Sequence, residues 1–568
     1  MNKRQKQFKR SVFYLVLAAI IIISSRSFYK NIVSAETVKG FVHVSGTEIL
    51  DENNKTYMAK GIAFGNDVWS NPSVPPSKHH TQESYKELSK LGFNSIRFYL
   101  NYGLFEDDEK PYKYKQSGWN WLDKNIAWAK KYNMKLVLNM HYPQGGFQSN
   151  GDGMELWTNE ENKDRLIALW KEIARRYKNE PVIMAYDLLN EPYVAELESE
   201  EETFAQWENL AKRIVTEIRK VDKNHMIIVE RLNASKNIDT GKADWNPDRN
   251  GDMNFFLIED DNIAYEFHAY EPMEFTHQNA FWIDGHEGNF TAYPDEDAIK
   301  TIGDIQWEGF TDSNPKAGRK ASGWQYMKGE RFKINNPDYM FAQPTLQARN
   351  TGKSGTVWFD DITVKEYDEK GKFVREIHSY SFDKLQGWSL WQAGSSKGSG
   401  TYDAKEGRKE KGSLRITGTT DDANLSSYVD RIRLKQDYSY EISGYVLTKN
   451  IESQAEIRIR LDFYSCDRIY GRDKEYLESI IDQYVEFGKK NNVPLYLGEF
   501  GCITYAFQEE RGGERFVSDI IDICRDRKIS FSFHAYHEEA FGLYQNAANK
   551  LPDNVNRQLL NVFKKELK

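Results

Sequence analysis

Short apolar runs of strand length alternate with amphipathic stretches in two parts of the chain, at about 40–294 and after about 466. The runs are apolar at nearly every position of their first half, as expected for strands that are buried on both faces. Between most of them hydrophobic residues recur at helical spacing, which predicts an amphipathic helix. The eight runs are GIAF (61–64), SIRFYL (95–100), KLVLNMH (135–141), VIMAYDLLNE (182–191), MIIVERL (226–232), IAYEFHAY (263–270), LYLGEF (495–500) and ISFSFHAY (529–536).

Eight alternations of strand and helix predict an α/β fold, the (β/α)8 TIM barrel. One helix is doubtful, because the segment between the fifth and sixth runs is irregular. Ahead of the first run, FVHVSG and KTYMAKG flank the turn-rich EILDENN, which predicts a β-hairpin between those two flanking segments.

The pattern changes at about 295–465, where helical spacing is lost and short alternating strands are separated by Gly/Ser turns. Such a pattern predicts an all-β sandwich, inserted between barrel strands six and seven. We therefore expect a catalytic barrel in two parts, 36–294 and 466–568, interrupted by a sandwich domain at 295–465.

The N-terminus is expected to direct export. Basic residues, among them Lys3, Lys6 and Arg10, precede the apolar run VFYLVLAAIIII, which is too short for a bilayer core that needs about 20 residues. Small residues at Val33-Ser34-Ala35 resemble a cleavage site, so 1–35 is interpreted as a signal peptide. An uncleaved anchor is the alternative.

Composition narrows the class of protein. The 77 Lys and Arg against 85 Asp and Glu give a net charge of -8, which argues against a nucleic-acid partner. The 14 Trp, 33 Tyr and 31 Phe residues provide rings that can stack against the apolar faces of sugars. Three cysteines with no CxxC pair predict neither a disulfide framework nor a metal-binding motif.

Polar residues gather where the predicted strands end. In a TIM barrel these C-terminal ends form the mouth of the active site. The set is Arg97, His141, Asn190, Glu191, His268, Tyr270, Glu499, His534 and Tyr536. Each alone could be a packing residue or a salt-bridge partner. Two glutamates on different strand ends, among Arg, Asn, His and Tyr, predict an acid/base and nucleophile pair for glycoside cleavage.

The motifs that surround these residues resemble glycoside hydrolase family 5, a cellulase-like family of retaining barrel enzymes. They are SIRFYL, LNMHYP, YDLLNEP, FHAYEPMEFTHQ and YLGEFG, and the resemblance covers about 40–294 and 466–568. It implies that Glu191 is the acid/base and Glu499 the nucleophile. It also implies substrate-site roles for a further set of residues: Arg97, His141, Asn190, His268 and Tyr270.

The last strand departs from the family pattern, which usually has a tryptophan at the end of strand eight. This chain has FSFHAYHEEAFGLY there, so His534 is expected to form part of the sugar-binding floor. Trp282 and Trp69 are each interpreted either as stacking rings near the mouth or as core residues.

The predicted insert resembles a jelly-roll carbohydrate-binding module, through GTVWFDDITV, SFDKLQGWSLW, GSLRITG and YSYEISGYV. Whether it binds glycan or only shapes the cleft stays open. Candidate stacking rings are Trp307, Trp324, Trp388 and Trp391. A structural Ca2+ at Asp360 and Asp361 is a further hypothesis, and exposed turn carboxylates are the alternative.

These expectations combine into a secreted or cell-surface retaining glycosidase, acting on a polysaccharide or oligosaccharide and most simply an endo-β-glucanase. We expect a monomer with no cofactor, no catalytic metal, and no membrane contact beyond the signal segment. The alternatives are a mannanase, an exo-acting β-glucosidase, a catalytically silent glycan-binding protein and a metal-dependent barrel hydrolase.

Overall fold

The computed structural model describes residues 40–283, 285–311, 323–382, 388–427 and 430–568. These residues fall into two compact units, each of which is described by itself. The first unit holds the chain up to 270 together with 482–504 and 521–568, and the second holds 271–481 and 505–520. Within the described part, no helix has the length and apolar character needed to cross a membrane. The expected signal segment lies outside the described residues.

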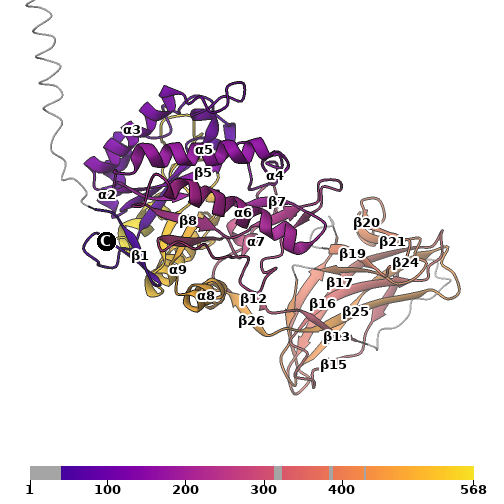
Figure 1. Cartoon of the computed structure of the whole chain (residues 1–568). Coiled ribbons are helices and arrows are strands. Elements are labelled where there is room, and N and C mark those ends of the chain that lie inside the picture. The colour runs from indigo at the N-terminus through magenta and orange to yellow at the C-terminus, as the bar shows by residue number, and fades with distance from the viewer. Residues whose placement is uncertain (1–39, 284, 312–322, 383–387, 428–429) are drawn as a thin grey trace, which may run out of the picture. The chain divides into compact units, whose positions relative to one another are not determined.

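Eight parallel strands close into a barrel in the first unit (Figure 1). This arrangement confirms the predicted TIM barrel. Around the barrel the strands are β3 (Lys60–Phe64), β4 (Ser95–Asn101), β5 (Lys135–Tyr142), β6 (Ile183–Asp187), β8 (Met226–Glu230), β11 (Ile263–Ala269), β27 (Leu495–Phe500) and β28 (Ser530–Phe533). Their side chains are almost entirely buried, because strands of a barrel are covered on both faces.

Amphipathic helices follow most of the strands. In α5 (Glu160–Tyr177) an apolar stripe that includes Leu166 and Trp170 is fully buried. The helix begins where the Asn159 side chain accepts a hydrogen bond from the Glu161 N–H. The long helices are α2 (Gln82–Leu91), α3 (Gln116–Lys131), α5 (Glu160–Tyr177), α6 (Glu200–Arg219), α8 (Lys474–Asn491), α9 (Gly513–Asp526) and α10 (Arg557–Glu566). Single-turn helices are α4 (Glu155–Thr158) and α7 (Met273–Thr276).

The irregular segment after the fifth barrel strand is indeed not helical. Residues 231–262, all of them described, contain the short strands β9 (Ala234–Lys236) and β10 (Ala243–Asp244) and no helix. These strands form a small sheet with β7 (Tyr193–Ala195).

The predicted N-terminal hairpin is wrong in its pairing. β1 (His43–Ser45) pairs with β2 (Glu48–Leu50), which lies inside the segment expected to be the turn. The two strands are joined through Gly46, whose φ of 57° allows a tight turn directly after β1. This register buries Ile49, and the expected partner KTYMAKG instead leads into barrel strand β3.

An all-β sandwich lies in the second unit, between barrel strands β11 and β27, as predicted. The first sandwich sheet has the order β13 (Gln306–Phe310), β25 (Glu456–Ser465), β16 (Phe341–Arg349), β22 (Ala423–Ser427) and β19 (Trp388–Gln392), with β23 (Ile432–Arg433) also paired to β16. The second sandwich sheet has the order β14 (Gln325–Lys328), β24 (Ser439–Lys449), β17 (Thr356–Tyr367), β21 (Ser413–Thr417) and β20 (Ser399–Asp403). In addition, β15 (Phe332–Lys333) pairs with β24, and β18 (Phe373–Tyr380) pairs with β17.

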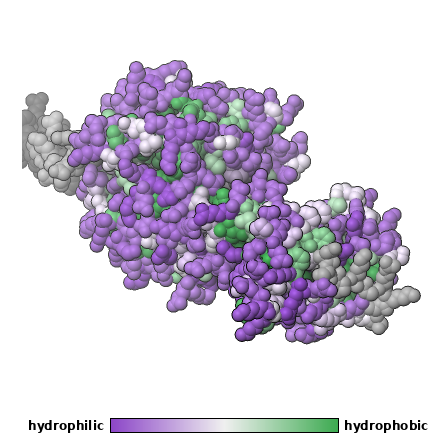
Figure 2. Space-filling view, turned by 90° about the horizontal axis from the view of Figure 1, so that it is seen from below, coloured by the Kyte–Doolittle hydropathy of each residue, from purple (hydrophilic) through white to green (hydrophobic). Residues whose placement is uncertain are grey.

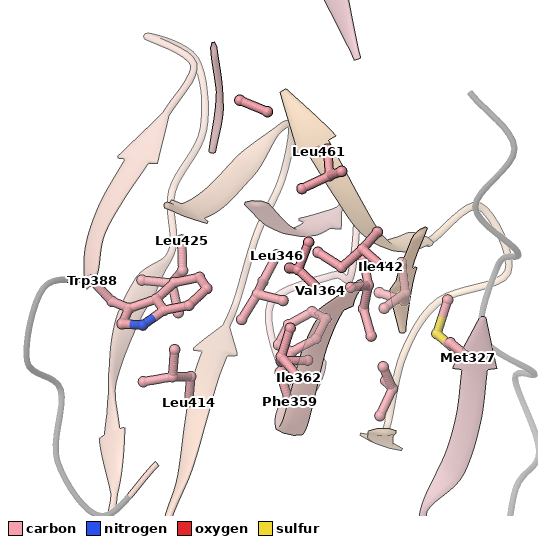
Figure 3. Close-up of a cluster of buried hydrophobic side chains, with 14 of the residues drawn as sticks. Met327, Leu346, Phe359, Ile362, Val364, Trp388, Leu414, Leu425, Ile442 and Leu461 are labelled. Atoms are coloured by element: carbon pink, nitrogen blue, oxygen red, sulfur yellow. The ribbon is translucent and has the colours of Figure 1, made fainter. Parts of the chain in front are cut away.

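Both sheets contribute to one hydrophobic core, shown in Figure 3. Leu346, Leu425 and Leu461 come from the first sheet, and Phe359 and Ile442 come from the second. A core shared by two sheets and filled by both is what defines a sandwich domain.

The chain enters and leaves the sandwich through a two-stranded ribbon. β12 (Asp295–Ile302) runs antiparallel to β26 (Arg468–Arg472), and Ile302 lies directly opposite Arg468. The two connections to the barrel sequence therefore lie side by side, which is the geometry that an inserted domain requires. On the face shown in Figure 2 the surface is mostly hydrophilic, with hydrophobic residues in small groups.

Candidate active site

Arg97 is the centre of a buried polar network at the C-terminal ends of the barrel strands. It projects from β4 and is fully buried. Its guanidinium donates to Glu499 Oε1 at 2.7 Å, to Asp187 Oδ2 at 2.9 Å and to Asn190 Oδ1 at 3.0 Å, and it forms an ion pair with Glu266 at 2.9 Å. One residue of β4 thus connects groups from the ends of β6, β11 and β27.

Glu499 is held by three donors. Besides Arg97, Tyr99 Oη donates to Oε1 at 2.5 Å and Tyr270 Oη donates to Oε2 at 2.8 Å. Burial opposes ionisation of this carboxyl, but the positive charges of His268, His534 and Arg97 outweigh it and hold the pKa of Glu499 well below its usual range. The side chain is therefore an oriented carboxylate, which suits a nucleophile.

Glu191 follows β6 in a left-handed conformation with φ 43°, which is unusual for a glutamate. Its backbone N–H donates to Glu230 Oε2 at 2.6 Å. Its side chain is 18% exposed, and Oε1 lies 2.9 Å from His268 Nδ1. The backbone of Glu191 is thus fixed by a buried neighbour while its carboxyl group reaches solvent.

The carboxyl groups of the two glutamates approach the same ring nitrogen of His268. A carboxylate oxygen from each and one ring nitrogen of His268 all lie within 4.8 Å of one another, and His268 Nδ1 is 3.7 Å from Glu499 Oε2. Burial disfavours a charged imidazole, but the carboxylates of Glu230 and Glu499 raise the pKa of His268 well above its usual value. A protonated His268 accordingly lies beside both carboxyl groups.

Two further expected site residues, Asn190 and His141, contact the buried network around Arg97 and Glu499. Asn190 accepts from Arg97 and donates from Nδ2 to Ser149 Oγ at 3.0 Å. His141 stacks on Tyr99 with ring centroids 3.8 Å apart, and burial lowers its pKa well below the usual value, so the ring is neutral.

His534 and Trp282 are the two residues whose expected roles depended on the least specific signals. His534 is 6% exposed, and its Nδ1 lies 3.0 Å from Tyr99 Oη and 4.0 Å from Glu499 Oε2. Trp282 belongs to the second unit, where it is 50% exposed and packs edge-on against Phe281. His534 therefore joins the network, and the role of Trp282, which lies in the second unit, stays a prediction.

Four residues of the network were not expected from the sequence. Tyr99 holds Glu499, and three buried carboxyl groups surround Arg97 and His268: Asp187, Glu230 and Glu266. The sequence held a signal for two of them, since Tyr99 lies two positions after Arg97 on β4 and Glu266 two positions before His268 on β11. Alternate residues of a strand point to the same side.

A half-exposed tryptophan and a polar pocket lie beyond the network in the same unit. The Trp69 ring is 44% exposed and packs edge-on against His141 at 5.1 Å and Phe147 at 5.5 Å. The pocket has a volume of about 450 Å3 and is lined mostly by polar side chains, including Tyr102 and Tyr142. Tyr142 stacks near Phe147 at 5.9 Å, so aromatic rings connect Trp69 to the pocket.

Among the residues that the structure describes, two groups of side chains have the spacing of metal ligands. They are Glu191, His268 and Glu499, and Glu230, Glu266 and His268. Both groups share the protonated His268, and the Arg97 guanidinium already pairs with Glu499 and with Glu266. Positive charges therefore already occupy the positions where a metal ion would be coordinated, so this donor set fits a metal ion poorly.

The expected Ca2+ ligands of the sandwich contact an arginine. Asp360 Oδ2 accepts from the Arg408 N–H at 2.7 Å, and Asp361 forms an ion pair with the Arg408 guanidinium. The Ca2+ site stays a prediction.

Comparison with known proteins identifies the family to which this barrel is similar. The family described as Cellulase (glycosyl hydrolase family 5) matches residues 50–322, a range that contains Glu191 and ends before Glu499. Endoglucanase C of Acetivibrio thermocellus is 31% identical over 264 residues, which cover 45% of this chain and 68% of that protein. The endoglucanase of Paenibacillus polymyxa is 26% identical over 286 residues, covering 47% of this chain and 70% of that protein.

Among solved structures, the endoglucanase Cel5A of Thermotoga maritima matches with a TM-score of 0.46 at 18% identity, over 89% of this chain and 96% of that chain. The match to the family covers the part of the barrel that carries Arg97, Asn190 and Glu191. The chain belongs to glycosyl hydrolase family 5 and is a glycoside hydrolase that acts on O-glycosyl bonds.

Proposed function

We propose that the protein is an endo-β-glucanase that cleaves its substrate with retention, by double displacement. The observation that carries this proposal is the pair Glu191 and Glu499, whose carboxylate oxygens approach within 4.8 Å of each other beside His268. Retaining glycosidases place their two carboxyl groups about 5–5.5 Å apart, whereas inverting enzymes leave a larger gap for a water molecule. The spacing supports retention.

The two carboxyl groups have different surroundings, which supports different roles. Glu499 receives three hydrogen bonds and stays ionised, so it attacks the anomeric carbon and forms a covalent glycosyl ester. Glu191 is the more exposed of the two, and its carboxyl group lies beside the protonated His268. It protonates the departing oxygen in the first step and activates water in the second.

Substrate contacts follow from the same network. Asn190 is oriented by Arg97 and Ser149, so that its amide can bind a sugar hydroxyl at the cleavage site. Trp69 offers a half-exposed ring beside His141, and such a ring stacks on a sugar next to the one that reacts. The polar pocket beyond it extends the surface available to a chain of sugars. A substrate longer than a disaccharide is therefore favoured.

The names of the similar proteins point in the same direction, since several are endoglucanases. We also propose that the enzyme is exported to the cell surface or medium, works as a monomer and needs no metal. The expected signal segment supports export, and the unfavourable donor set for a metal ion supports activity without a metal.

A product profile tests the function. We would incubate the full chain with soluble β-1,4-glucan, mixed-linkage β-glucan, β-mannan and xylan, and measure new reducing ends together with viscosity. An endo-β-glucanase lowers the viscosity of a β-glucan long before much sugar is released. Faster cleavage of mannan, or release of glucose with unchanged viscosity, would contradict the proposal in favour of a mannanase or an exo-acting enzyme.

A further inference from the structure

His534 directly follows the last barrel strand β28, at the position where the family usually has a tryptophan. An indole keeps its one hydrogen at every physiological pH, whereas an imidazole holds one or two. The side chain of His534 is almost fully buried, so its protonation depends on the protein groups around it. The titratable and charged groups that face it are Arg97, Tyr99, His141, Tyr270, Glu499 and Glu538.

The first ring nitrogen of His534 must carry a hydrogen. Tyr99 Oη has a single hydrogen, which it donates to the ionised Glu499 at 2.5 Å. The same Oη lies 3.0 Å from His534 Nδ1. Because the hydroxyl has no second hydrogen to give, it can only accept in this contact, and Nδ1 is the donor.

The second ring nitrogen faces a carboxylate. His534 Nε2 lies 3.4 Å from Glu538 Oε1, and the Glu538 side chain is only 12% exposed. A carboxylate accepts hydrogen bonds and does not donate them. Burial opposes a charged imidazole, but the carboxylates of Glu538 and Glu499 outweigh it and raise the pKa of His534. With a hydrogen on each nitrogen, His534 is an imidazolium.

Glu538 is held in place by its own turn. Its Oε1 accepts the Phe541 N–H at 3.0 Å, and its backbone carbonyl accepts the Gly542 N–H at 3.2 Å. A Cβ at Gly542 would lie 2.3 Å from that carbonyl oxygen, so the turn requires glycine there. The Phe541 ring also packs against His534 with ring centroids 5.6 Å apart. One turn therefore fixes both the carboxylate and one side of the imidazole.

We propose that Glu538 is a positioning residue for the nucleophile: it keeps His534 as an imidazolium, so that Tyr99 donates its hydrogen to Glu499 alone. A neutral His534 that stays paired with Glu538 would carry its one hydrogen on Nε2 and present the lone pair of Nδ1 to Tyr99. The Tyr99 hydrogen would then be divided between that nitrogen and the nucleophile. The charge of Glu538 thus sets the direction of the hydrogen bonds that lead to Glu499.

The inference gives a role to the departure from the family pattern at His534, because a tryptophan there could not respond to a carboxylate in this way. It rests on the proposed function in taking Glu499 as the nucleophile. Since Glu538 acts through His534, its effect must depend on pH and must disappear when His534 is replaced.

The test is the pH profile of kcat/KM for the full chain on a nitrophenyl β-glycoside, which reacts with little need of the Glu191 proton. Glu538→Gln removes the charge and keeps an oxygen for the Phe541 N–H. An ion pair at such a distance shifts a pKa by about one to three units. Activity is present below the pKa of His534 and falls as the pH rises through it, so the alkaline limb should move to lower pH by at least about one unit.

The matched control is Glu539→Gln, which removes the same charge from the neighbouring exposed residue and should leave the limb in place. In a His534→Gln background, the addition of Glu538→Gln should not move the alkaline limb, because the titrating ring is gone. The 15N chemical shifts of the His534 ring, in enzyme labelled with 15N-histidine, report its protonation without turnover. Their midpoint should fall in Glu538→Gln by the same shift.

Several results would overturn the proposal. They are an alkaline limb that stays in place in Glu538→Gln, an equal shift in Glu539→Gln, a shift that persists without His534, and His534 nitrogens that titrate alike with and without the Glu538 charge. If nitrophenyl glycosides are cleaved with the expected shift but no β-glucan is cleaved, the proposed function fails and the role of Glu538 stands. If β-glucan is cleaved with retention and the limb does not move, only the role of Glu538 fails.

Discussion

The contact between Glu230 and the backbone of Glu191 predicts a substitution whose effect depends on the leaving group. Glu230 is 2% exposed and accepts the Glu191 N–H at 2.6 Å. Burial and the neighbouring Glu266 raise its pKa well above the usual value despite the charge of His268. Glu230 is therefore a buried acceptor that keeps Glu191 in its left-handed conformation.

Replacement of Glu230 by alanine leaves the Glu191 N–H without its acceptor. An unsatisfied buried donor costs about 1–3 kcal/mol, so a transition state that needs a correctly placed Glu191 should lose roughly 5- to 150-fold in rate. Polymer cleavage needs the proton from Glu191, whereas a nitrophenolate leaves with little help. Glu230→Ala should thus lower kcat/KM on β-glucan by this factor and largely spare kcat/KM on a nitrophenyl glycoside.

Glu230→Gln is the matched control, because its amide oxygen still accepts the N–H. It should restore kcat/KM on both substrates toward the wild-type values. Thermal unfolding of each variant establishes that the comparison is between folded proteins. An equal loss on both substrates in Glu230→Ala, or no rescue in Glu230→Gln, would refute the positioning role.

Three further predictions address the insert, the pH dependence and metals. Replacing 303–467 with a two-residue Asn-Gly turn between Ile302 and Arg468 should close a hairpin and leave a cooperatively unfolding barrel that still cleaves aryl glycosides; loss of folding would show that sandwich and barrel share their stability. His534 is one of the charges that lower the pKa of Glu499, so the acidic limb of kcat/KM should lie below the usual carboxylate range and move to higher pH in His534→Ala. An unmoved limb would contradict this. Activity should survive dialysis against EDTA, and loss that Zn2+ or Ca2+ restores would favour the metal-dependent alternative.

The barrel could be predicted because its signal is repeated eight times. Each strand is apolar where it is buried, and each helix that follows carries a stripe such as Leu166, Leu169 and Trp170. The hairpin ahead of it was predicted wrongly because Gly46 allows a tighter turn than the segment DENN suggested. Two turn signals lie close together in this part of the chain, Gly46 and the segment EILDENN. The structure forms its tight turn at Gly46.

The candidate site was only partly accessible to sequence reasoning. The strand-end motifs identified Glu191, Glu499 and Arg97, which the structure brings together. Glu230 and Asp187 were missed because a buried carboxyl group in a strand has no distinctive sequence pattern. The role of such a carboxyl group depends on partners from other strands, as the contact of Glu230 with the Glu191 N–H shows. Those partners are known only once the strands are placed next to one another in the structure.

The measurement that tests the central claim most directly is the mass of the enzyme during turnover of an activated aryl β-glycoside by Glu191→Ala. Glu499 should still attack, but the base that activates water is missing, so a covalent sugar should accumulate. We predict a mass increase of one glycosyl unit that maps to Glu499, and its discharge by azide to a product of β configuration. An unmodified enzyme with an inverted product, or an adduct on any residue other than Glu499, would contradict double displacement through this glutamate.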